Sequence, residues 1–277
     1  MRKVKQMSRT QSIALVGAVL ALSIALQAAV RASDSKNAFV IAEPGTQTEQ
    51  EFPERDEIRK SYQLLPGARV DVSVIYGPVD IETANTNTAE IHIVRSARSR
   101  EDLSFRKIGI EQTSTGLVIS GERDVSEGPA RVRHRVLLKL PRRVELSVQM
   151  INARVNVGEV DGTVRLSRIN GAVEVARAVA SSEISHINGS LTMMITGLRE
   201  QGVRADHING AVELRIADEL NADLVVTEFN GAVSPDVANV TVLEKTPRMI
   251  FRARIGAGGI PISISDVNGS VRLSRAG

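Results

Sequence analysis

The protein has 277 residues, which is enough chain for one long all-β domain or two smaller domains. It contains no Cys and no Trp, two Tyr and five Phe, which excludes disulfide bonds, Cys-ligated zinc and Cys nucleophiles and leaves few rings to stack on bases. The formal net charge is +3, but residues 33–277 carry 30 basic and 32 acidic side chains. Because no global positive field remains there, we expect no nucleic-acid partner.

A basic and then apolar leader occupies residues 1–32. Five basic side chains and no acid accompany an apolar run at residues 13–26, and Val30-Arg31-Ala32 suits a cut after Ala32. These features are typical of a signal peptide. The alternative is an uncleaved anchor, because residues 13–30 have about the length of a membrane span. In either case we expect export to the periplasm or cell surface, with membrane contact only through a retained leader.

Residues 33–60 are polar, contain two Pro and show no sustained period, so they are predicted to form a flexible linker. From residue 61 onward apolar and polar residues alternate, as where Val70, Val72 and Val74 are separated by polar side chains. Short alternating runs punctuated by Gly, Pro, Asn and Asp predict an all-β fold over residues 61–277. Residues 61–140 are expected to supply N-terminal strands that cap or begin the coil, and residues 141–277 regular rungs.

An Asn-Gly dipeptide, or a close variant, returns through the second half of the chain with gaps of 9, 9, 18, 21, 21 and 38 residues. The residue before the dipeptide is apolar in every case. The predicted rung corners are Asn152-Ala153, Asp161-Gly162, Asn170-Gly171, Asn188-Gly189, Asn209-Gly210, Asn230-Gly231 and Asn268-Gly269. The predicted interior column is Ile151, Ile169, Ile187, Ile208, Phe229 and Val267.

This repeat predicts a β-solenoid, a coil of short stacked strands. Asn-Gly tolerates positive φ and therefore suits a tight corner. Each turn of 18–21 residues would carry two strands and two corners, with successive turns about 4.8 Å apart. The Asn side chains could form a ladder along one edge, and Asp161, half a period out, should lie at the opposite edge. The rung near residues 240–255 lacks the marker and is expected to turn at residues 244–247.

Three sets of motifs carry a family resemblance. They are Leu65-Pro66-Gly67 before alternating valines, Leu140-Pro141 before another alternating run, and the serial Asn-Gly rungs. Over roughly residues 60–277 the chain resembles the bacterial "putative adhesin" family, an adhesin-like domain of unknown function. The resemblance implies an extracytoplasmic, β-solenoid-like domain with no established activity.

Few side chains suggest chemistry. His186 and His207 hold the same place in successive rungs, with Asp206 adjacent, but a divalent site usually needs three or four ligands. The other interpretation is a solvated column that also contains Arg168 and Glu228. We therefore predict no metal ligands and no cofactor.

Catalytic motifs are not found, and the two carboxylates at matching offsets, Glu174 and Glu213, would lie two rungs apart, too far for a coupled acid pair. The prediction is a non-enzymatic, exported envelope protein with an adhesin-like interaction or scaffold role. Its partner would be an unknown envelope protein or polysaccharide. The alternatives are a carbohydrate-active β-helix enzyme and a membrane-anchored extracytoplasmic sensor.

Overall fold

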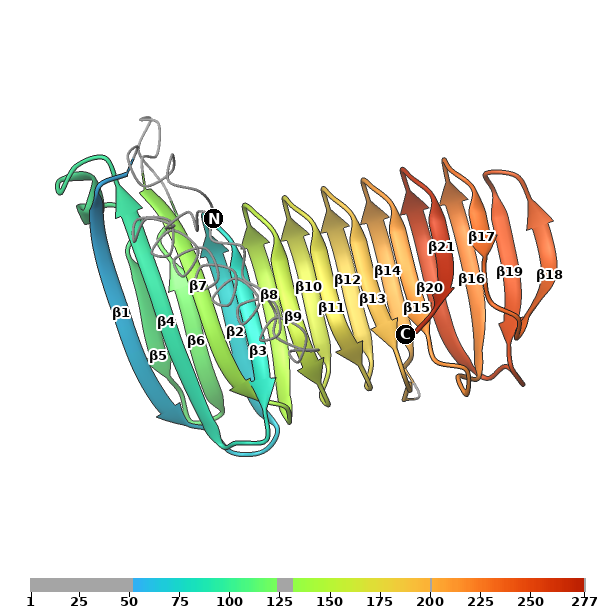
Figure 1. Ribbon diagram of the computed structural model, residues 1–277, viewed down its shortest axis with the longest axis horizontal. Coiled ribbons are helices and arrows are strands. Elements are labelled where there is room, and N and C mark those ends of the chain that lie inside the picture. The colour runs from blue at the N-terminus through green and yellow to red at the C-terminus, as the bar shows by residue number, and fades with distance from the viewer. Residues whose placement is uncertain (1–51, 124–131, 200, 277) are drawn as a thin grey trace, which may run out of the picture. The chain divides into compact units, whose positions relative to one another are not determined.

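The computed structural model describes residues 52–123, 132–199 and 201–276 (Figure 1). In these ranges nearly all regular structure is β-strand, because 21 strands form two sheets and the remaining element is a 3-10 turn at Asp102–Ser104. The predicted all-β class of stacked strands is confirmed. The predicted leader, residues 1–32, lies outside the described residues, as do residues 33–51 of the predicted linker.

The strands form two sheets, here called sheet A and sheet B, whose inward apolar side chains share one core. Sheet A has the spatial order β1 (Glu54–Gln63), β4 (Thr88–Ala97), β7 (Val132–Pro141), β3 (Val79–Ala84), β9 (Val155–Val160), β11 (Val173–Ala178), β13 (Leu191–Ile195), β15 (Val212–Ile216), β21 (Val271–Arg275), β17 (Val233–Pro235). Sheet B has the order β18 (Val240–Thr246), β19 (Ile250–Ile255), β16 (Ala222–Phe229), β20 (Ile260–Val267), β14 (Val203–Ile208), β12 (Ser182–Ile187), β10 (Val164–Ile169), β8 (Val144–Ile151), β2 (Ala68–Ile75), β6 (Gly116–Gly121), β5 (Ile108–Gln112).

The chain winds as a β-solenoid, because each coil gives one strand to sheet B and the next to sheet A. In spatial order the coils are β6–β7, β2–β3, β8–β9, β10–β11, β12–β13, β14–β15, β20–β21 and β16–β17. Neighbouring coils pair in parallel in both sheets, as β10 pairs with β12 and β11 with β13. Two of these coils, β2–β3 and β6–β7, are built from the N-terminal strands.

The order of the coils in space differs from their order in the chain at both ends of the solenoid (Figure 1). Near the N-terminal end β2–β3 lies between β6–β7 and β8–β9, and near the C-terminal end β20–β21 lies between β14–β15 and β16–β17. The chain enters β20, which lies between β14 and β16, after a reversal at residues 256–259. In this reversal Gly256, Gly258 and Gly259 have left-handed φ values of 57°, 78° and 129°. Such values are available to Gly at low steric cost.

Antiparallel strands close the ends of the stack. The region predicted as an unmarked rung, residues 240–255, instead forms the hairpin β18–β19, which pairs antiparallel with β16. At the other end β5 pairs antiparallel with β6, β4 with β7, and β1 with β4.

Strand β1 starts at Glu54, so the predicted linker at residues 33–60 is wrong in its last seven residues. The sequence pattern did not predict this strand, because a strand at the edge of a sheet needs little apolar surface. In β1 only Ile58 and Tyr62 pack against the core as partly buried hydrophobic residues.

The six residues of the predicted interior column lie in register on sheet B, in the spatial order Ile151, Ile169, Ile187, Ile208, Val267, Phe229. Each is at most 6% exposed. Because six consecutive coils each contribute a side chain to the column, its burial removes apolar surface from water along most of the stack.

Replacing Ile208 with Asp should destabilise the fold by about 4 kcal/mol or more, because an unpaired carboxylate would be buried among Ile187 and Val267. Ile208→Val, which keeps the column apolar, should cost only about 1 kcal/mol. Urea unfolding followed by circular dichroism measures both variants. Equal midpoints for Ile208→Asp and the parent would contradict this placement.

The corner glycines serve a purpose different from the predicted one. The left-handed φ values of 53–55° fall two residues before each Asn, at Met150, Arg168, His186, His207, Glu228 and Asp266, whereas the marker glycines do not have positive φ. The prediction of positive φ at Asn-Gly is therefore wrong. Glycine is needed because the coils approach closely there: a Cβ on Gly210 would lie 2.4 Å from the carbonyl oxygen of Gly189, and one on Gly189 the same distance from that of Gly171.

Gly210→Ala should therefore lower the free energy of unfolding by about 1–3 kcal/mol, since two neighbouring coils must separate to admit the methyl group. Gly197→Ala is the matched control, because a Cβ there meets nothing within 4 Å. Thermal unfolding of both variants measures the difference. A Gly210→Ala protein as stable as the Gly197→Ala protein would show that close stacking does not select glycine.

Candidate functional site

The Asn residues of the corners form the ladder that the repeat suggested. Each Nδ2 donates to the Oδ1 of the neighbouring coil, at 2.9 Å from Asn170 to Asn152, Asn188 to Asn170, Asn209 to Asn188 and Asn268 to Asn209, and at 3.3 Å from Asn230 to Asn268. These amides hold coils together, which makes this edge structural. Asp161 and Gly162 lie in the β9–β10 turn at the other end of the strands.

The two stacked histidines form a column on the outer side of sheet B. The rings of His186 and His207 are parallel within 5°, with centroids 4.7 Å apart. His207 also lies 3.1 Å from Asp206 and 3.4 Å from Asp266, measured between ring nitrogen and carboxylate oxygen. Within the ranges that the structure describes, no group of three or more His, Cys, Asp or Glu is arranged to hold a metal ion.

A buried histidine, which the sequence pattern did not single out, anchors the N-terminal coils. The backbone N–H of Tyr76 donates to His134 Nδ1 at 3.3 Å, and His134 Nε2 lies 3.0 Å from the carbonyl oxygen of Arg106. Burial in this position lowers the pKa of His134 from 6.5 to about 4. The sequence could have indicated this burial, because His134 alternates in step with the inward-facing Val132 and Val136 of β7.

This buried imidazole makes stability depend on pH. The folded pKa is depressed, so between its folded and unfolded pKa values the unfolded chain binds a proton that the folded chain does not, and stability falls as pH falls below about 6.5. We expect a loss on the order of 2 kcal/mol between about pH 7 and about pH 5. Urea unfolding across this range should show a flatter pH dependence for His134→Gln. A parental slope in His134→Gln would contradict the assignment.

The carboxylates that could have formed an acid pair are separated. Thr192 lies between Glu174 and Glu213 in the register of sheet A. Arg215 and Ser274 both donate hydrogen bonds to Glu213, at 3.2 and 3.0 Å, and lower the pKa of its carboxyl group. Glu213 therefore serves a local polar network of the outer face.

A groove of about 970 Å³ crosses the turns at the edge opposite the Asn ladder. Its walls come from the segment before β2 and from the β7–β8, β9–β10, β11–β12 and β13–β14 turns, and it ends at the start of β20. The residues that line it are Gly67, Arg143, Val144, Glu145, Asp161, Gly162, Thr163, Val179, Ala180, Ser181, Leu198, Arg199, Gln201 and Ile260. The sequence pattern did not reveal it, because these turns differ in length and composition.

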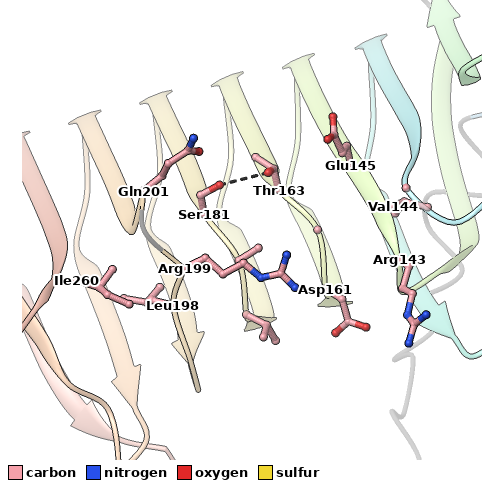
Figure 2. A pocket seen from close by; sticks show the side chains of 14 residues that line it. Arg143, Val144, Glu145, Asp161, Thr163, Ser181, Leu198, Arg199, Gln201 and Ile260 are labelled. Atoms are coloured by element: carbon pink, nitrogen blue, oxygen red, sulfur yellow. Dashed lines mark hydrogen bonds between the residues drawn. The ribbon is translucent and has the colours of Figure 1, made fainter.

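Polar side chains line the groove in two rows (Figure 2). One row consists of Glu145, Thr163, Ser181 and Gln201, in which the hydroxyl oxygens of Thr163 and Ser181 lie 3.2 Å apart. The other row consists of Arg143, Asp161 and Arg199.

The charged side chains of the groove differ in ion pairing from the charged side chains just outside it. Arg142, next to Arg143 in sequence, pairs with Glu159 at 3.0 Å. Within the described residues, the side chains of Arg143, Glu145, Asp161 and Arg199 form no ion pair within 4 Å. Their hydrogen-bonding capacity is therefore available to a ligand.

No helix in the described parts of the chain has the length and apolar character needed to cross a membrane.

Comparison with solved structures finds low-identity likenesses. A protein described as a "putative cell adhesion protein" from Clostridium sporogenes is 12% identical with a TM-score of 0.46, over 80% of this chain and 100% of that one. A "putative adhesin" from Bacteroides fragilis is 10% identical with a TM-score of 0.29, over 80% and 98% of the two chains. One from Parabacteroides merdae is 11% identical with a TM-score of 0.26, over 78% and 96%. No protein-family model and no curated protein sequence matches the chain.

Proposed function

We propose that this chain is an exported, non-enzymatic, adhesin-like module that binds an extended partner of the cell envelope along the groove. The observation that carries the proposal is a groove that crosses successive turns and contains charged side chains that form no ion pair with any residue the structure describes. Groups that are left unpaired in a concave surface are those that a ligand can engage at the least cost in broken internal bonds.

The scaffold is suited to such a role because it fixes the turns rigidly. The Asn ladder and the apolar column determine the position of each coil relative to the next, so the groove side chains project from a frame that does not need to be ordered on binding. Pre-organisation of this kind lowers the entropic cost of association.

Export rests on the leader at residues 1–32, whose charged segment, apolar run and cut site after Ala32 fit a secretory signal. If the leader is retained, the same body becomes a membrane-anchored sensor. The mass of the mature protein distinguishes the two arrangements.

A carbohydrate-active enzyme is the second candidate, because the groove contains two carboxylates, Glu145 and Asp161. Glycoside cleavage needs two carboxyl groups that face the same bond at about 5–10 Å separation. In Figure 2 these two side chains point away from each other, which favours binding over cleavage.

The test is cosedimentation of the full chain with purified bacterial cell-wall sacculi and with outer-membrane vesicles. We expect binding to one of these fractions, and the double variant Arg143→Ala/Arg199→Ala should weaken it at least about tenfold, since two desolvated guanidinium contacts are lost. Arg204→Ala is the matched control, because Arg204 lies on β14 outside the groove. Groove-independent binding, or binding to neither fraction, would overturn the proposal. Release of soluble sugars that depends on Glu145 and Asp161 would favour the enzyme instead.

A further inference from the structure

The groove has the shape of a trough for a long ligand. Its lining comes from six coils that are neighbours in space, those that contain β2, β8, β10, β12, β14 and β20. Since neighbouring strands lie about 4.8 Å apart, five intervals give a length of about 24 Å. A compact small molecule would use only a part of this length, so the dimensions indicate a chain-like ligand.

The chemistry of the trough is balanced along its length. Arg143 and Arg199 can only donate hydrogen bonds, the carboxylates of Glu145 and Asp161 can only accept them, and Thr163 can do both. A matching ligand must therefore offer donors and acceptors repeatedly. Hydroxyl groups do so, because each one donates and accepts.

The charge of the trough also selects among polymers. Two guanidinium groups and two carboxylates give no net charge, and Asp161 lies between Arg143 and Arg199 in its row (Figure 2). A polyanion would meet the carboxylates and a polycation would meet the guanidinium groups. A neutral chain meets neither repulsion.

Backbone groups where the turns meet the strands already pair between neighbouring coils. The N–H groups of Leu146, Val164 and Ser182 donate to the carbonyl oxygens of Thr163, Ser181 and Gly202 in the neighbouring coils, at 2.9, 3.1 and 3.0 Å. Peptides that extend a sheet need free backbone groups at an edge. Because these groups already take part in sheet pairing, a peptide added as a strand is disfavoured, and we expect the lining side chains to contact the ligand.

From these observations, and resting on the proposed function, we propose that the trough binds a neutral, linear glycan that lies along the solenoid axis, with hydroxyl groups facing the four coils that contain β8, β10, β12 and β14. None of the described residues that line the trough is aromatic, so the sugar rings have no stacking platform and each coil contributes little affinity. Affinity should therefore grow with glycan length until the four coils with polar lining side chains are engaged, and added salt should change it little.

The experiment titrates the full chain, by calorimetry or ligand-observed NMR, with β-1,4-linked N-acetylglucosamine oligomers from dimer to hexamer. Polygalacturonate and an uncharged extended peptide are the comparison probes. We expect the hexamer to bind more tightly than the dimer and to keep its affinity within about twofold when salt is raised from about 0.05 to about 0.5 M.

The variant pair is Thr163→Val against Thr192→Val. Thr163 lines the trough, whereas Thr192 is a half-buried residue on the outer side of sheet A. Loss of one hydroxyl contact should weaken hexamer binding roughly fivefold in Thr163→Val and leave it unchanged in Thr192→Val.

Four results would overturn the inference. In the first, polygalacturonate binds in a way that depends on Thr163 and weakens with salt, while the neutral oligomers do not bind. In the second, the peptide binds in a way that depends on Thr163. In both cases the proposed envelope-binding function stands, because the groove still binds an extended partner. The third is neutral-oligomer binding that Thr163→Val and Arg143→Ala/Arg199→Ala leave unchanged, which would place the glycan elsewhere. Failure of every probe, combined with groove-dependent sedimentation with sacculi, would reject the glycan and retain the function.

Discussion

The close approach of neighbouring coils at the Asn-Gly edge is the constraint on which the rest of the structure depends. Glycine allows the backbones to meet there, and each Asn amide then bonds its counterpart in the adjacent coil. Because side chains alternate between the two faces of a strand, a slip by one residue would turn Ile187 and its neighbours out to solvent. The ladder and the apolar column therefore enforce the same register.

The turns at the groove edge of the solenoid can vary in sequence because the Asn-Gly edge is constant. The turns that carry Asp161, Ser181 and Arg199 have different sequences, and the turn with Arg199 is longer than the other two, yet all three start and end on strands whose positions are fixed. The chain thus separates a repetitive part, which supplies stability, from a varied part, which supplies polar groups for recognition. Sites on loops held by a rigid scaffold commonly have this arrangement.

The sequence predicts the features that a period can encode. The interior column and the Asn ladder follow from the constant spacing of Ile187 and Asn188 to their counterparts. The spatial order of the coils cannot be predicted from the period. The sequence pattern around Val267 would be the same whether its coil lay outside the coil of Phe229 or between the coils of Ile208 and Phe229. Strand β1 and the groove could not be predicted either, because an edge strand and irregular turns contain no repeated pattern.

The inserted position of the last coil has a mechanical consequence. A solenoid whose terminal residues form its outermost coil can be peeled one coil at a time when tension is applied to the chain end. Here strands β20 and β21 are gripped by parallel partners on both sides, β14 and β16 in one sheet and β15 and β17 in the other. Tension on the chain beyond β21 must therefore shear several rows of hydrogen bonds together, and the stack can close only after β20 and β21 have been added.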